Sequence, residues 1–177
     1  MTAQQWFEQA REVAVRAHGD QRYGDKPYEY HLRAVVEVLT RFGATLDDNA
    51  TAPLLIAAWL HDTLEDTGLE RSLLQEQFGV EVAELVWRVT DEPGATRKER
   101  KPATYRKMRE SELAVVLKVA DRIANAEAAL ESNRGLLRMY QREHDEFRSA
   151  LRPGSRGMLA DALWAHLERL LSASETK

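Results

Sequence analysis

Apolar residues recur at helical spacing along almost the whole chain. Over residues 3–18 they gather on one face, which predicts an amphipathic helix whose apolar positions are Trp6, Ala10, Val13 and Ala17. The same pattern predicts further helices at 28–42, 51–62, 71–78, 80–90, 111–130, 136–151 and 155–171. No run alternates convincingly with period two, and no internal repeat is visible. The expected fold class is therefore all-α.

Glycine and proline mark the expected boundaries between these helices. Gly79 separates 71–78 from 80–90, and the stretch Asp91–Lys101, with Pro93 and Gly94, is expected to be an exposed loop. The helix that begins near residue 51 is apolar almost all round over 54–60. A helix of that kind should lie centrally in the fold.

Composition indicates a globular protein of 177 residues with 44% apolar and 31% charged residues, which suits a single domain over 1–177. The absence of cysteine excludes disulfides, thiolate catalysis and Cys-ligated metals, and it fits a reducing compartment. The N-terminus lacks the apolar core of a signal peptide. No stretch approaches the roughly 18 apolar residues that a membrane span needs. We therefore expect a cytoplasmic protein without a membrane partner.

The formal net charge of −4 argues against bulk nucleic-acid binding, which usually needs a basic surplus. One segment differs from the rest of the chain, because residues 97–110 hold seven basic and two acidic side chains. Such a segment on an acidic protein can bind a small polyanion, or it can simply be a solvated helix surface. The charge pattern alone does not decide between the two.

Metal-binding side chains with apolar flanks occur at four places: His31, the pair His61-Asp62, the pair Glu65-Asp66, and Asp121. On a helix that continued past His61, Glu65 would lie one turn beyond it, and Asp66 one turn beyond Asp62. Three carboxylates and an imidazole would then converge and repel one another unless a cation joined them. Structural pairing is the alternative for the dipeptide His61-Asp62.

Asp121 stands among apolar residues on its expected helix, so its carboxylate should be semi-buried. A salt bridge to Arg122 or Lys118 would explain it without a metal. His31, near the start of a helix, could equally be a surface or capping histidine. Each residue alone is therefore weak support for a metal site.

The ordered combination of these residues carries more information. A histidine, then a His-Asp pair some 30 residues on, then an aspartate about 60 residues later, resembles the signature of the HD phosphohydrolase superfamily. The segments 17–31, 57–67 (AAWLHDTLEDT), 78–90 and 117–125 (LKVADRIAN) further resemble the hydrolase domain of RelA/SpoT-type proteins, above all the stand-alone small alarmone hydrolases such as the metazoan SpoT homologue. The resemblance spans roughly 3–130, and helices within 131–175 are expected to complete an HD-domain helical bundle.

The resemblance implies a metal centre and a catalytic pair. The residues expected to ligate one divalent ion, Mn²⁺ in the family, with other divalent metals also able to bind, are His31, His61, Asp62 and Asp121. Glu65 and Asp66 match the acids that orient or deprotonate the attacking water, without a division of roles. His31 is followed by Leu32 where the family usually has proline, a change that should not affect ligation.

Substrate contacts follow from the same resemblance. Asn125 matches a residue that binds the ribose–phosphate region. Arg22, or Lys26 if the turn between Gln21 and Pro27 is one residue shorter than usual, would stack against the purine. Basic residues after Thr90 could neutralise phosphates; they are Arg97, Lys98, Arg100 and Lys101.

The expected activity is 3′-pyrophosphohydrolysis of a purine alarmone, (p)ppGpp and/or (p)ppApp, with release of pyrophosphate. Two alternatives stay open: a related HD phosphatase, namely a nucleotidase or an NADPH 2′-phosphatase, or a catalytically idle HD module that binds nucleotide. The last two helices could complete the core or form the face of a homo-oligomer, and we expect them to complete the core.

Overall fold

The computed structural model describes residues 1–172, and 173–175 of the expected C-terminal helical segment lie outside the described residues. The first half contains α1 (Ala3–His18), β1 (Arg22–Tyr23), β2 (Lys26–Pro27), α2 (Glu29–Arg41), α3 (Ala52–Leu60), α4 (Thr63–Asp66) and α5 (Arg71–Val89). The second half contains α6 (Arg97–Met108), α7 (Glu112–Ser132), α8 (Arg134–Leu151), a 3₁₀ turn η1 (Arg152–Gly154) and α9 (Gly157–Ser172). Apart from the small two-stranded sheet, the described chain is helical, so the all-α prediction is confirmed.

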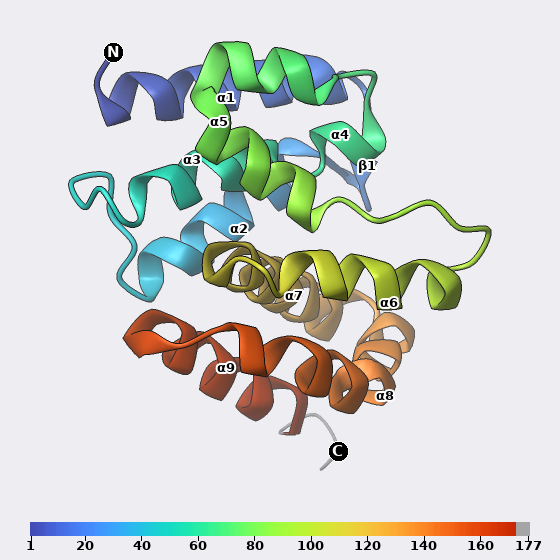
Figure 1. Cartoon of the computed structure of the whole chain (residues 1–177). Coiled ribbons are helices and arrows are strands. Elements are labelled where there is room, and N and C mark those ends of the chain that lie inside the picture. The colour runs from blue at the N-terminus through green and yellow to red at the C-terminus, as the bar shows by residue number, and fades with distance from the viewer. Residues whose placement is uncertain (173–177) are drawn as a thin grey trace.

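Helix α7 lies at the centre of the arrangement and contacts α2, α3, α5, α8 and α9. Figure 1 shows α1, α3 and α5 on one side of it and α8 and α9 on the other. The core runs through both groups, because buried side chains from α3, α7, α8 and α9 belong to one cluster. Every residue of α3 from Leu54 to Leu60 is buried, as expected for a helix that is apolar all round. Within the described residues, no helix is long and apolar enough to cross a membrane.

The expected loop Asp91–Lys101 is partly wrong, because α6 begins at Arg97. The side chain of Thr96 accepts a hydrogen bond from the backbone N–H of Glu99 and so caps the helix N-terminus. Further along, the buried side chains of Tyr105 and Met108 fix α6 against the core. Pro93 and Gly94 do lie in a loop, as predicted. That loop ends at Thr96, because α6 begins at the next residue.

The helix expected to run through His61-Asp62 does not continue to Asp66. It ends at Leu60, and a separate short helix, α4, begins at Thr63. Two side chains accompany the break: His61 Nδ1 lies 2.8 Å from the carbonyl oxygen of Ala58, and Thr63 Oγ1 donates to that of Leu60 at 2.7 Å. Side chains that bond to nearby carbonyls in this way compete with the helical hydrogen-bond ladder.

The turn after α1 forms a small antiparallel hairpin that the hydrophobic pattern did not indicate. Arg22 pairs with Pro27 and Tyr23 with Lys26, around Gly24 at φ +62°. Gly79 behaves as expected, because its φ of +84° and ψ of 168° break α5 into two helical segments. That conformation is essentially restricted to glycine.

Candidate active site

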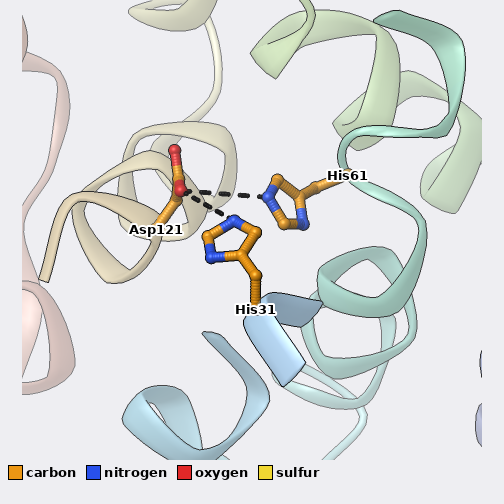
Figure 2. Close-up of side chains that lie close together, drawn as sticks. All are labelled: His31, His61 and Asp121. Carbon is orange, nitrogen blue, oxygen red and sulfur yellow. Dashed lines mark ion pairs between the residues drawn. The ribbon is translucent and has the colours of Figure 1, made fainter. Parts of the chain in front are cut away.

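Three segments bring the four sequence-predicted ligands into one cluster. His31 lies near the start of α2, His61 and Asp62 follow α3, and Asp121 lies on α7. His31 Nε2 is 3.3 Å from Asp121 Oδ1 and 3.5 Å from Asp62 Oδ2, while His61 Nε2 is 3.0 Å from Asp62 Oδ2 and 3.9 Å from Asp121 Oδ1. One ligand atom each from His31, His61 and Asp121 lies within 4.8 Å of the others, and Figure 2 shows both imidazoles turned toward Asp121.

The protonation of His61 is set by its backbone contact. A carbonyl oxygen can only accept, so Nδ1 must carry the hydrogen that it donates to Ala58. In the neutral ring Nε2 then presents a lone pair, and this buried atom has no hydrogen-bond partner among the described residues. The lone pair faces carboxylate oxygens, an arrangement that a cation between them would stabilise. The donor set therefore fits a divalent ion.

The electrostatics of the cluster favour positive charge. Burial lowers the pKa of the His31 imidazole, but Asp121 and Asp62 outweigh this effect and raise the pKa to about 9. Burial raises the pKa of Asp62 and Asp121, but the histidines and, for Asp121, Lys118 lower both pKa values well below the usual range. Both aspartates are thus ionised at neutral pH, as metal ligands must be.

Side chains from the segment before α2 hold the carboxylates in place. Tyr28 donates its hydroxyl to Asp62 Oδ2 at 2.7 Å, and its ring stacks on His18 at 4.4 Å. His18 Nδ1 lies 2.7 Å from Gln21 Oε1, and Gln21 Nε2 donates to Asp66 Oδ2 at 2.8 Å. The N-terminal region therefore orients acids from two separate parts of the site.

Glu65 and Asp66, the predicted catalytic pair, line the same cavity as the cluster. Glu65 Oε2 accepts a 3.1 Å hydrogen bond from the backbone N–H of Asp91. Burial raises the pKa of the Glu65 carboxyl, and the charge of Asp91 adds to the effect. A carboxyl group with a raised pKa is a better proton acceptor than an ordinary surface glutamate.

The cavity has a volume of about 190 Å³ and two parts of opposite charge. Its acidic part is lined by His31, Asp62 and Asp121 of the cluster and by the other acids, with Lys118 paired to Asp121 at 2.9 Å; its cationic part is lined by Arg97, Lys101 and Arg122, and the rings of Tyr105 and Tyr140 also line the cavity. Such a space suits an anionic ligand whose charge lies at some distance from a metal-binding centre.

Of the four predicted phosphate-binding residues, Arg97 and Lys101 line this cavity and the other two do not. Lys98 is exposed. Arg100 Nε lies 3.1 Å from Asp91 Oδ2 in an ion pair. The basic segment is therefore divided, with one turn of α6 directed into the cavity and the intervening residues elsewhere.

Asn125 lies beside the cluster, as its position one turn after Asp121 predicts. Its Nδ2 donates to Asp121 Oδ1 at 2.5 Å, and its Oδ1 accepts from the Tyr23 hydroxyl at 2.8 Å. Arg22 and Lys26 are both exposed on the hairpin and do not line this cavity. Arg22 donates to the carbonyl of Asp25.

Lys26 lies over the Tyr30 ring at 3.8 Å from its centroid. It lines a separate cavity of about 680 Å³, between the hairpin and the end of α7, together with Tyr23 and Tyr30. Because Tyr23 also bonds Asn125, the two cavities adjoin across the Tyr23 ring.

Sequence reasoning did not identify Gln21, Tyr28 or Tyr140 as site residues, and it treated Lys118 only as a salt-bridge partner. Tyr28 and Lys118 each precede a proposed ligand by three residues, a spacing that places side chains on one helical face. That signal could have identified both. Gln21 and Tyr140 come from other elements, so only the tertiary structure brings them to the site.

Comparisons with known proteins agree on one family. The family described as "HD domain" matches residues 10–146. A probable GTP pyrophosphokinase of Mycobacterium leprae is 37% identical over 131 residues, which are 67% of this chain and 15% of that protein. The human guanosine-3′,5′-bis(diphosphate) 3′-pyrophosphohydrolase MESH1 is 34% identical over 121 residues, 66% of this chain and 65% of the human protein. The chain thus spans less than two thirds of the length of these relatives.

Solved structures share the fold. A protein described as a metazoan orthologue of SpoT that hydrolyses ppGpp superposes with a TM-score of 0.71 at 23% identity, covering 91% of this chain and 94% of that one. The protein lmo0812 from Listeria monocytogenes superposes with a TM-score of 0.66 at 23% identity, covering 83% of this chain and 99% of that one.

Proposed function

This chain belongs to the HD domain family, and from that premise we propose that it is a metal-dependent 3′-pyrophosphohydrolase of purine alarmones, (p)ppGpp or (p)ppApp. The observation that carries the proposal is the convergence of His31, His61, Asp62 and Asp121 beside a cavity that the cationic side chains of Arg97, Lys101 and Arg122 also line. The names of the relatives support the substrate class, because MESH1 is named for this reaction.

We propose that those four residues hold one divalent ion, Mn²⁺. Two imidazole nitrogens and two carboxylate oxygens suit such an ion, and they leave coordination positions open. When bound, the ion polarises a phosphoryl group and lowers the pKa of a bound water. Tyr28 keeps Asp62 in position through its 2.7 Å hydrogen bond, so it is proposed as a positioning residue.

We assign the acid–base work to Glu65 and Asp66. Glu65, with its raised pKa, is well suited to accept a proton from the attacking water. Asp66 is held by Gln21 and would help to orient that water. The reaction breaks the bond between the 3′ oxygen of the ribose and its phosphorus: the water oxygen bonds to that phosphorus, the 3′ oxygen takes a proton, and the products are pyrophosphate and the nucleoside 5′-di- or triphosphate.

Substrate binding is assigned to both parts of the cavity. Arg97 and Lys101 would neutralise phosphate oxygens, and Asn125 would contact the ribose–phosphate region. Lys26 or Arg22 would contact the purine from the hairpin. Lys98 and Arg100, which do not line the cavity, would add only long-range positive charge.

We further propose that residues 1–177 act as one domain in the cytoplasm on a small nucleotide, with no nucleic-acid partner. Net charge supports the last point, because the chain carries −4 rather than a basic surplus. The absence of cysteine fits a reducing compartment.

The test is a turnover assay of the purified, Mn²⁺-loaded chain with ppGpp, ppApp, NADPH and deoxynucleoside monophosphates, with products identified by chromatography. We expect pyrophosphate and the nucleoside 5′-diphosphate from at least one of ppGpp and ppApp, and no turnover by the Asp121→Asn variant. Orthophosphate from the monophosphates or NADPH alone would assign the chain to the related phosphatases instead. No product from any substrate would favour a nucleotide-binding module.

A further inference from the structure

In the cationic part of the cavity, three positive side chains share one carboxylate, that of Glu143 on α8. Arg97 Nε lies 3.1 Å and Lys101 Nζ 2.7 Å from Glu143 Oε1, and Arg122 Nη1 lies 3.4 Å from Oε2. The three cations come from α6 and α7, so Glu143 joins three helices; Figure 1 shows α6 and α8 on the right of the view, beside the central α7.

The charges of this group do not balance. Within residues 1–172, Glu143 is the only carboxylate within ion-pair distance of these three cations, so the group carries a surplus of two positive charges. Two of the three cations are shielded from water, because the side chains of Lys101 and Arg122 are only 9% and 5% exposed, whereas that of Arg97 is 45% exposed. Buried cations without a matching anion are costly, so this arrangement favours the entry of an anion.

The surplus charge faces the cavity rather than the core. Arg97, Lys101 and Arg122 all line the cavity that contains the histidine–aspartate cluster. Arg122 is further fixed by the rings of Tyr140 and Phe147, at 4.6 and 4.5 Å from their centroids. The cations are therefore preorganised where a ligand can reach them.

We propose that Arg97, Lys101 and Arg122 form a subsite for a diphosphate group, and that Glu143 is a built-in competitor that holds these cations when no ligand is bound and weakens anion binding there. A diphosphate that enters the subsite takes over donors from the Glu143 carboxylate. The inference rests on the proposed function, because it assigns the subsite to the pyrophosphate part of the substrate and to the product.

The competitor is charged at neutral pH. Burial raises the pKa of the Glu143 carboxyl, but Arg97 and Lys101 outweigh that effect and lower the pKa to about 2. Its negative charge therefore opposes every anion in the subsite. The opposition grows with the charge of the ligand, so it should be stronger for pyrophosphate than for orthophosphate.

The test is a calorimetric titration of the Mn²⁺-loaded chain of 177 residues with inorganic pyrophosphate and, separately, with orthophosphate. Glu143→Gln keeps the size of the side chain and removes its charge. We expect it to bind pyrophosphate tighter by roughly tenfold, with a smaller gain for orthophosphate and a steeper loss of affinity with added salt. Glu127→Gln is the matched control, because Glu127 pairs with Arg41 and His166 and does not line this cavity, and it should leave both affinities unchanged.

The inference would be overturned if a folded Glu143→Gln protein bound pyrophosphate within about twofold of the wild-type affinity, or more weakly. Glu143 would then be only a structural link between helices. If that variant does not fold, Arg97→Gln replaces it, since the Arg97 side chain is 45% exposed. Arg97→Gln should weaken pyrophosphate binding at least roughly fivefold, and unchanged binding would equally overturn the subsite.

These titrations contain no nucleotide, so their outcome is independent of the proposed reaction. A chain that binds pyrophosphate as described but cleaves no alarmone would disprove the function and retain the subsite. A chain that cleaves an alarmone but whose pyrophosphate affinity does not change in Glu143→Gln would retain the function and disprove the role of Glu143.

Discussion

His61 Nδ1 lies 2.8 Å from the carbonyl oxygen of Ala58, three residues earlier in the chain. This contact directs the other ring nitrogen, Nε2, toward the carboxylates of Asp62 and Asp121. It lies where α3 ends at Leu60 and the helical hydrogen-bond ladder stops. The interruption of the most apolar helix in the chain is therefore part of how the site is built.

The raised pKa of Glu65 leads to a prediction about pH. Burial places this pKa above the ordinary value of 4.5, so at saturating Mn²⁺ kcat/KM should fall as the pH drops through the raised pKa and the base becomes protonated. Glu65→Gln should lower kcat about 10²- to 10⁴-fold and remove this acidic limb. Asp66→Asn should lower activity but keep the limb. The test is to measure pH–rate profiles of the wild type and of both variants. The assignment fails if the acidic limb persists in Glu65→Gln and vanishes in Asp66→Asn.

Gly79 provides a test of the fold away from the site. Its backbone adopts φ +84° and ψ 168°, so an alanine would be strained even though nothing lies within 4 Å of the added Cβ atom. Gly79→Ala should lower the free energy of unfolding by about 1–3 kcal/mol with kcat unchanged. Gly68→Ala is the control, because Gly68 also has open space around the added Cβ atom but no positive φ. It should change the free energy of unfolding by less than about 0.5 kcal/mol. If urea unfolding showed the same loss of stability for Gly79→Ala and Gly68→Ala, the backbone explanation would be contradicted.

Glu143 should also contribute a pH-dependent part of stability. Its folded-state pKa of about 2 lies below the ordinary value of 4.5, so the ionised carboxylate stabilises the fold. That contribution is complete above about pH 4.5 and is lost as the pH falls toward 2. Glu143→Gln should therefore unfold at lower urea concentration at pH 7, and its difference from the wild type should narrow between pH 4.5 and 2. A constant difference across that range would show that Glu143 stabilises by packing alone.

Much of the fold could be predicted from local pattern. The apolar run of α3 required burial, and glycine at position 79 indicated the break in α5, because both signals come from a few neighbouring residues. The start of α6 could not be fixed in this way. Its cap at Thr96 is a weak local signal, and buried Tyr105 and Met108 hold the helix through distant contacts.

The site shows the same division between local and tertiary information. His31, His61, Asp62 and Asp121 could be found because their order along the chain is distinctive. Glu143 could not be found from the sequence, because nothing in its helix indicates that Arg97, Lys101 and Arg122 converge on it. Of the basic segment, only the structure distinguishes the residues that line the cavity from Lys98 and Arg100.

The central claim is that one divalent cation binds between His31, His61, Asp62 and Asp121, and equilibrium binding of Mn²⁺ tests it most directly. Free Mn²⁺, measured by electron paramagnetic resonance during titration, should reveal one site per chain in the wild type. Asp121→Asn should lose that site, while Asp47→Asn, on the exposed loop before α3, should keep it. Tight stoichiometric binding that survives Asp121→Asn, or no binding by the wild type, would contradict the account.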